Sequence, residues 1–129
     1  MRIGIVEVGG ELSKVFQSEI APRIEMAEFE TKKALDLFDV LAYTRKMIGL
    51  DQLVLIVHLD SEETELNRVF FQGLATLEGE TGKNIFKCFY YEDEEGEPKV
   101  KELADTFFNY IFSPEKLEKK EKPEEEFPF

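Results

Sequence analysis

Tryptophan is absent from this chain of 129 residues, and cysteine and histidine occur once each, as Cys88 and His58. A single cysteine excludes an intramolecular disulfide and a cysteine-based metal cluster. Any Ser-His arrangement would have to use this one histidine, and the four serines lack the strand-to-helix elbow that presents a catalytic nucleophile. We therefore expect no metal site, no bound cofactor and no serine-type nucleophile.

Positive charge and long apolar runs are also scarce. The chain has 16 Lys and Arg against 28 Asp and Glu, a net charge of -12, which repels phosphate backbones and anionic lipids. We expect neither a nucleic acid nor a membrane partner. No apolar run approaches the roughly 20 residues of a membrane span, and no export segment is visible, so we expect a cytoplasmic protein. The abundance of Glu and Lys, with few Asn and Gln, resembles thermophile proteins.

The stretch Leu53 to Glu78 contains the clearest structural signal. Leu53 to Val57 is unbroken aliphatic sequence, typical of a strand that is covered on both faces in a parallel sheet. From Leu66 to Leu77 the apolar residues recur at helical spacing. The residues His58 to Ser61 between them form the predicted turn of a strand-turn-helix unit.

The same unit repeats along the chain. Strands are predicted at 3–8, 24–31, 53–57 and 84–91, and helices at 11–21, 32–48, 66–78 and 98–112. Short connections and right-handed crossovers then give an α/β fold with a four-stranded parallel sheet of order 2-1-3-4 and helices on both faces. We expect one domain over residues 1–112 and a charged tail over 113–129, whose last residues are Phe127-Pro128-Phe129.

Two helices carry more apolar surface than one sheet can cover. In the segment 32–48, Leu35, Phe38 and Ala42 widen the main apolar stripe, and Phe71 lies off the stripe of its own helix. Surfaces of this kind are commonly buried against another subunit, so we expect a homo-oligomer. A single extended contact within the chain is the alternative.

Ligands of open α/β sheets bind at the carboxyl ends of the strands, where the strand order reverses. Here that point lies between the first and third strands, which brings Gly9 and Gly10 next to the turn from His58 to Ser61. His58 is the only side chain that titrates near neutrality without perturbation, and it is our candidate proton carrier. A histidine at the end of a buried strand can equally be structural.

Three further residues are ligand-binding candidates. Asp60 and Ser61 follow the third strand, and Arg68 could contact an anion from the next helix. Asp60 with Glu63 also fits a capping box, so these residues have a structural explanation as helix-start residues. Gly9-Gly10 fits a permissive turn as well as a close approach to a ligand. The acidic run 92–95 is typical of a solvated loop rather than a metal site.

The helix-to-strand junction in the second half of the chain contains Gly73-Leu74-Ala75, Thr81-Gly82 and Asn84-Ile85-Phe86. The spacing of these residues resembles the same junction in the lumazine synthase superfamily. Archaeal-type riboflavin synthase is more similar still, at Thr81, Lys83, Phe89, Glu92-Asp93-Glu94, Phe112, Pro114, Glu115 and Leu117.

This resemblance implies a flavodoxin-like αβα sandwich, a pentamer, and chemistry on ribityllumazine at sites between subunits, with a pterin- or flavin-like ligand. Two family features are absent. Residues 31–34 stand where lumazine synthases have a Pro-Gly turn. The helix after the third strand lacks the histidine that these enzymes have there. The first hypothesis is therefore a lumazine/riboflavin-synthase-like protein, and the second is a non-catalytic assembly or regulatory module of the same fold. A flavodoxin-like nucleotide binder is the third.

Overall fold

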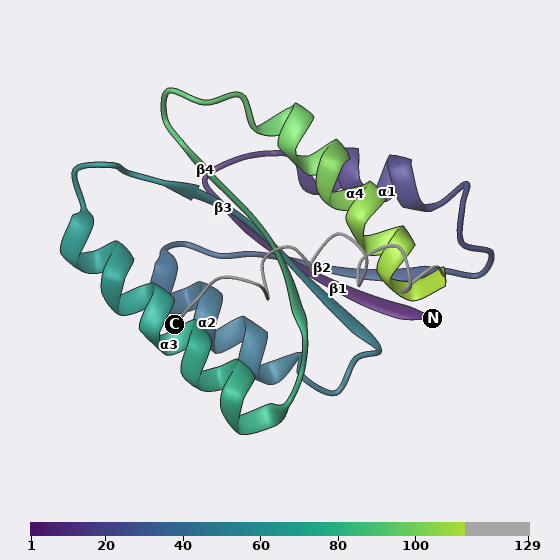
Figure 1. Ribbon diagram of the computed structural model, residues 1–129, viewed down its shortest axis with the longest axis horizontal. Coiled ribbons are helices and arrows are strands. Elements are labelled where there is room, and N and C mark those ends of the chain that lie inside the picture. Colours follow the sequence, from purple (N-terminus) through teal and green to yellow (C-terminus); the bar gives the residue numbers. More distant parts are fainter. Residues whose placement is uncertain (113–129) are drawn as a thin grey trace, which may run out of the picture.

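The computed structural model describes residues 1–112, and the predicted tail over 113–129 lies outside the described residues. Strands and helices alternate along the described chain (Figure 1). The elements are β1 (Arg2–Val8), α1 (Ser13–Ile20), β2 (Glu28–Lys33), α2 (Leu37–Lys46), β3 (Gln52–Leu59), α3 (Thr64–Thr81), β4 (Ile85–Tyr91) and α4 (Gly96–Phe112).

The described strands form one parallel sheet in the order β2-β1-β3-β4, which confirms the predicted topology. In the centre of the sheet Ile5 of β1 lies between Thr31 of β2 and Val54 of β3. The two central strands are buried along most of their length. Because β1 and β3 are neighbours and the chain leaves them in opposite directions, the strand order reverses between them, as predicted.

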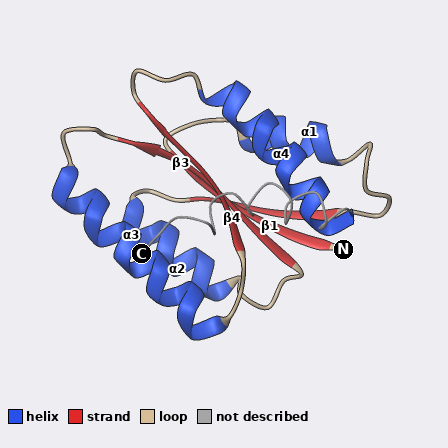
Figure 2. Cartoon of the chain, viewed as in Figure 1, coloured by secondary structure: helices blue, strands red, loops and turns tan. Residues whose placement is uncertain are grey.

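Helices cover both faces of this twisted sheet (Figures 1 and 2). The pair α1 and α4 packs on one face, where Phe16 and Phe107 meet edge to face with ring centroids 5.3 Å apart. The pair α2 and α3 packs on the other face, where Val40 and Phe70 are fully buried. Side chains from alternate strand positions therefore enter two separate cores, as expected for a three-layer α/β sandwich.

The second strand begins later than the sequence predicts. Residues 24–27 precede β2 as a loop, in which Ile24 is buried whereas Met26 is 84% exposed and has a φ of 63°. The prediction that Ile24 and Met26 share one strand face is therefore wrong. Alternation of apolar residues suggested a strand, but β2 instead begins at Glu28, whose backbone N–H donates to the carbonyl of Met1 (2.8 Å).

The second helix is also shorter than predicted, because β2 continues to Lys33. An N-cap residue, Asp36, accepts a hydrogen bond from the backbone N–H of Asp39 (2.8 Å), and the helix begins at Leu37. The side chain of Asp39 in turn accepts from the backbone N–H of Leu35 (2.8 Å). The two carboxylates fix the loop between β2 and α2, and they leave Leu35 91% and Phe38 56% exposed.

The third strand runs two residues beyond the predicted end, so His58 belongs to β3 and does not begin a turn. The predicted capping box is wrong, because α3 begins at Thr64 with Glu63 as an N-cap that has no side-chain hydrogen bond. Asp60 instead stabilises the preceding turn, where its carboxylate accepts from the backbone N–H of Glu62 (2.9 Å). Within residues 1–112, no helix is both long enough and apolar enough to cross a bilayer.

Candidate functional site

The carboxyl end of β1 carries a buried acid. Glu7 is fully buried on the strand face that also holds Ile3 and Ile5. Its carboxylate accepts hydrogen bonds from the backbone N–H groups of Leu12 (2.6 Å) and Ser13 (3.1 Å), at the start of α1. A helix start presents free N–H groups that suit an anion. In this protein the Glu7 carboxylate occupies the position at the start of α1 where an anion would bind.

A lysine of the edge strand closes this arrangement from the solvent side. The Nζ of Lys33 lies 3.6 Å from Glu7 and 2.9 Å from Glu11, and it donates to the carbonyl of Gly10 (2.7 Å). The hydrogen bond to Glu11 is the main cause that raises the pKa of Lys33, and the same bond lowers the pKa of Glu11. The ion pairs hold the loop after β1 against β2.

The two glycines of that loop pack against aromatic side chains. Gly9 has a φ of 81°, and a Cβ there would lie 2.7 Å from the Cβ of His58. A Cβ on Gly10 would lie 2.5 Å from the hydroxyl oxygen of Tyr90. Both positions require glycine because a neighbouring side chain occupies the space, and Gly9 also because of its left-handed backbone. The side of Gly10 where a ligand could approach closely is taken by Tyr90.

His58 lies beside this loop, on the α1 and α4 face of the sheet. Its ring packs on the ring of Tyr90, with centroids 5.0 Å apart and an angle of 34° between the planes. Burial is the main cause that raises the pKa of the Tyr90 hydroxyl, and the charge of Glu7 adds to it. His58 also lines a cavity of about 320 Å³ together with Asp60 and Glu92. We call this the His58 cavity.

A hydrogen-bonded clamp joins the loops that follow β3 and β4. The carboxylate of Glu92 accepts a hydrogen bond from the backbone N–H of Ser61 (3.1 Å) and another from its hydroxyl. The hydroxyl bond is the main cause that lowers the pKa of Glu92. Glu92 was predicted to be part of a solvated loop, yet it connects the candidate turn to the neighbouring strand.

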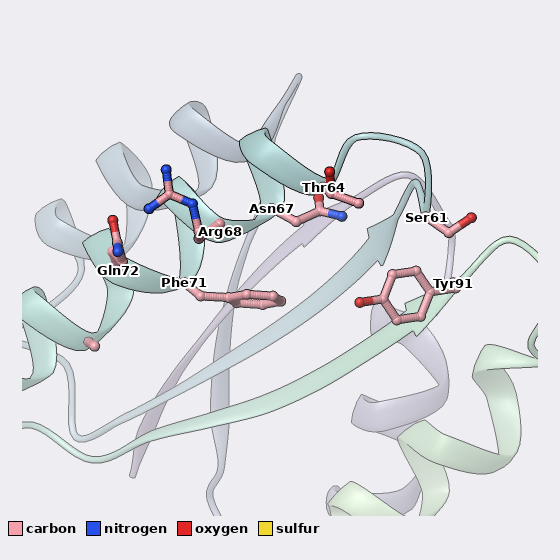
Figure 3. A pocket seen from close by; sticks show the side chains of 8 residues that line it. Ser61, Thr64, Asn67, Arg68, Phe71, Gln72 and Tyr91 are labelled. Carbon is pink, nitrogen blue, oxygen red and sulfur yellow. The ribbon is translucent and has the colours of Figure 1, made fainter.

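A second, larger cavity of about 480 Å³ opens on the other face of the sheet, between α3 and the end of β4. Its surface is mainly apolar, and its wall includes Ser61, Asn67, Arg68, Phe71, Gln72 and Tyr91. Figure 3 shows the ring of Phe71 reaching from α3 toward Tyr91, with Ser61 on the loop above them. We call this the α3–β4 cavity. Phe71 and Tyr91 contribute its two aromatic rings.

The base of the α3–β4 cavity is fixed by packing and by one amide. Phe71 rests on Phe89 of β4, with ring centroids 5.3 Å apart. The Nδ2 of Asn67 donates to the carbonyl of Asp60 (2.8 Å), which ties the helix to the turn. The buried Oδ1 of Asn67 has no hydrogen-bond partner among the described residues. Arg68 is half exposed and pairs with Glu65 one turn earlier.

The predicted site residues are therefore divided between two places. Gly9 contacts His58, which shares the His58 cavity with Asp60, so these three residues lie together at the carboxyl ends of β1 and β3. Ser61 and Arg68 line the α3–β4 cavity instead. Gly10 packs against the hydroxyl group of Tyr90.

Several residues of this region were not predicted from the sequence, above all Glu7 and Tyr90. The alternation of β1 contained a signal for Glu7, because it occupies the same strand face as Ile3 and Ile5 and must point inward. No comparable signal distinguishes Tyr90 from Tyr91, since only the packing of β4 shows which ring meets His58. Among residues 1–112, no three His, Cys, Asp or Glu side chains are grouped so that they could hold a metal ion.

Comparison with known protein families finds no family model that matches this sequence, and no curated protein matches it.

Proposed function

We propose that the chain is a homo-oligomeric, lumazine/riboflavin-synthase-like protein that binds a ribityllumazine or flavin-like ligand at a subunit interface. The observation that carries the ligand site is the His58 cavity, where the lone histidine shares a cavity of about 320 Å³ with the carboxylates of Asp60 and Glu92. It lies at the carboxyl ends of the strands beside the reversal of strand order, which is where open α/β sheets bind ligands.

The size of the cavity supports a site shared between subunits. Ligand pockets commonly enclose roughly 300–1,000 Å³, so the His58 cavity is at the small end of that range for a bicyclic ligand with a ribityl chain. A neighbouring subunit would supply the remaining wall. We propose a pentamer, as in the family that the sequence resembles.

The roles follow from chemistry and position. His58 would carry a proton to or from the bound ligand, because its imidazole lines the cavity and has one ring nitrogen that can donate a proton and one that can accept it. Asp60 and Glu92 would accept hydrogen bonds from ligand N–H or O–H groups. Arg68 would contact an anionic group only from the α3–β4 cavity, and it would first have to leave Glu65.

Turnover of ribityllumazine tests the enzymatic form of this proposal. The purified protein should convert ribityllumazine to riboflavin, detected by riboflavin fluorescence, and His58→Ala should lose that activity. Met26→Ala is the control, because Met26 is exposed and precedes β2 at the opposite end of the sheet. A wild-type protein that gives no riboflavin contradicts the enzymatic form.

A second candidate function is a non-catalytic assembly or regulatory module. It is favoured by Leu35 and Phe38, whose exposed side chains offer protein contacts and no chemistry. An oligomer that neither turns over nor binds ribityllumazine in native mass spectrometry would support it. The third candidate, a flavin mononucleotide binder, is disfavoured because Glu7 already accepts from the N–H groups of α1 that a phosphate would need.

A further inference from the structure

The α3–β4 cavity has the dimensions and the surface of a small-molecule site. Its volume of about 480 Å³ lies within the roughly 300–1,000 Å³ of most ligand pockets. Its mainly apolar wall includes the ring of Phe71, from α3, and the ring of Tyr91, from the end of β4 (Figure 3). Flat aromatic ligands pack on rings of this kind, by offset stacking or edge to face.

One polar atom of the cavity wall lacks a hydrogen-bond partner. Asn67 is only 6% exposed, and its Nδ2 donates to the carbonyl of Asp60 (2.8 Å), which determines the orientation of the amide. The Oδ1 is left buried and without a donor among the described residues. Buried polar atoms are nearly always hydrogen-bonded, so an exception of this kind indicates a partner that comes from outside the chain.

The donors of neighbouring wall residues are used elsewhere. Ser61 gives both its backbone N–H and its hydroxyl group to Glu92. Arg68 pairs with Glu65, and its guanidinium group is directed away from the ring of Phe71 (Figure 3). A donor that enters the cavity is therefore the partner that the Oδ1 of Asn67 lacks.

The charges around the cavity disfavour an anionic ligand. Glu63 and Glu65 are exposed on either side of Thr64, which lines the cavity. The positive charge of Arg68 is offset by its pair with Glu65. In a chain whose net charge is -12, these carboxylates repel phosphates and carboxylates. The ligand that suits this wall is neutral, flat and mainly apolar, and it has a hydrogen-bond donor.

We propose that the α3–β4 cavity binds a neutral aromatic heterocycle of the indole type, whose ring N–H donates to the Oδ1 of Asn67. An indole ring matches the wall because it is apolar, has one donor and has no acceptor. The Oδ1 is covered by neighbouring atoms, so binding includes a small turn of the Asn67 side chain toward the ligand. The site is separate from the His58 cavity, and the inference does not depend on the proposed function.

Fluorescence titration of indole with the full chain tests the site. The chain contains no tryptophan, so emission excited at the red edge of the indole absorption comes from the ligand. Binding should raise the fluorescence anisotropy of indole and shift its emission to shorter wavelength. Indole should bind about tenfold more tightly than 1-methylindole, which has the same ring and an added methyl group but lacks the N–H donor. Equal or tighter binding of 1-methylindole overturns the proposal, as does the absence of indole binding.

Variants of the cavity wall test the location of the bound ring. Phe71→Ala should weaken indole binding about tenfold, because it removes one of the two aromatic rings. Ala75→Phe should abolish binding by filling the cavity, and it removes no contact from the fold. Val69→Ala is the matched control, since Val69 is exposed on the same helix but does not line the cavity. Circular dichroism checks that each variant is folded, and wild-type affinity in folded Ala75→Phe overturns the proposal.

His58→Ala separates this site from the proposed function. His58 lines the other cavity, so His58→Ala should bind indole with wild-type affinity. A loss of indole binding in this variant would assign the ring to the His58 cavity and overturn the proposal. Indole binding by a wild-type protein that forms no riboflavin supports the site and counts only against the enzymatic proposal.

Discussion

Glu7 provides the sharpest stability test of this structure. Replacing it by alanine leaves the N–H groups of Leu12 and Ser13 without an acceptor inside the protein. A buried donor left without a partner costs about 1–3 kcal/mol. Because Glu7 is fully buried, water cannot replace the carboxylate without entering the core. We therefore expect Glu7→Ala to lower the free energy of unfolding by about 3–5 kcal/mol.

Glu7→Gln separates the hydrogen bonds from the volume of the side chain. The amide keeps one acceptor oxygen but turns an N–H group toward a second donor, so we expect a loss of about 2 kcal/mol. The measurement is urea unfolding followed by circular dichroism at a fixed protein concentration, with the slope compared between variants. Glu25→Gln is the matched control, because Glu25 is exposed on the loop before β2 and its replacement should leave the midpoint unchanged.

An anion should partly rescue the alanine variant. Without the Glu7 carboxylate, two N–H groups at the start of α1 are free to receive formate, which is small enough for the space that the side chain leaves. Formate should therefore raise the midpoint of Glu7→Ala more than that of wild type at equal ionic strength. A loss below about 1 kcal/mol in Glu7→Ala would refute the reasoning, since it would mean that these N–H groups find water at little cost.

Three other predictions concern individual residues of the same region. Gly9→Ala should destabilise the fold by about 2 kcal/mol or more in thermal unfolding, because Gly9 has a positive φ and the imidazole of His58 lies beside it. Gly49→Ala should be nearly neutral, because the space around Gly49 is open. The pKa of Glu92 is lowered from its ordinary value of 4.5, so its hydrogen bond to Ser61 stabilises the fold fully above pH 4.5 and is lost as the pH falls through the lowered pKa. Wild type and Ser61→Ala should therefore differ in stability at pH 7 and converge at pH 2–3. Burial raises the pKa of Cys88 to about 11, so native protein should not react with a thiol reagent at pH 7.5, and rapid labelling without unfolding would contradict this burial.

Much of the fold was predictable because hydrophobic patterning is a local property of the sequence. The apolar run from Leu53 to Val57 indicated a buried central strand, and β3 contains it. Right-handed crossovers then determined the order of the strands. The ends of elements were less predictable, as at β2, where alternation from Ile24 suggested a strand that begins only at Glu28.

The sequence predicted where in the fold the candidate site lies, but it did not predict which side chains contact one another there. The reversal of strand order indicated that Gly9 and His58 would be neighbours, and they are. The clamp between Ser61 and Glu92 joins residues that are 31 positions apart. Such a pair depends on the relative positions of two loops, which no local pattern specifies.

The amino-acid sequence by itself determined the alternation of strands and helices, the parallel sheet and the excess of apolar surface on the second helix, because these follow from side-chain period and composition. Only the tertiary structure decided which strand face holds Glu7 against the start of α1 and which ring, Tyr90, packs on His58. It also decided that Leu35 protrudes at one edge of the sheet while a cavity opens at the other. These properties depend on how distant segments pack together, and packing is a property of the whole chain.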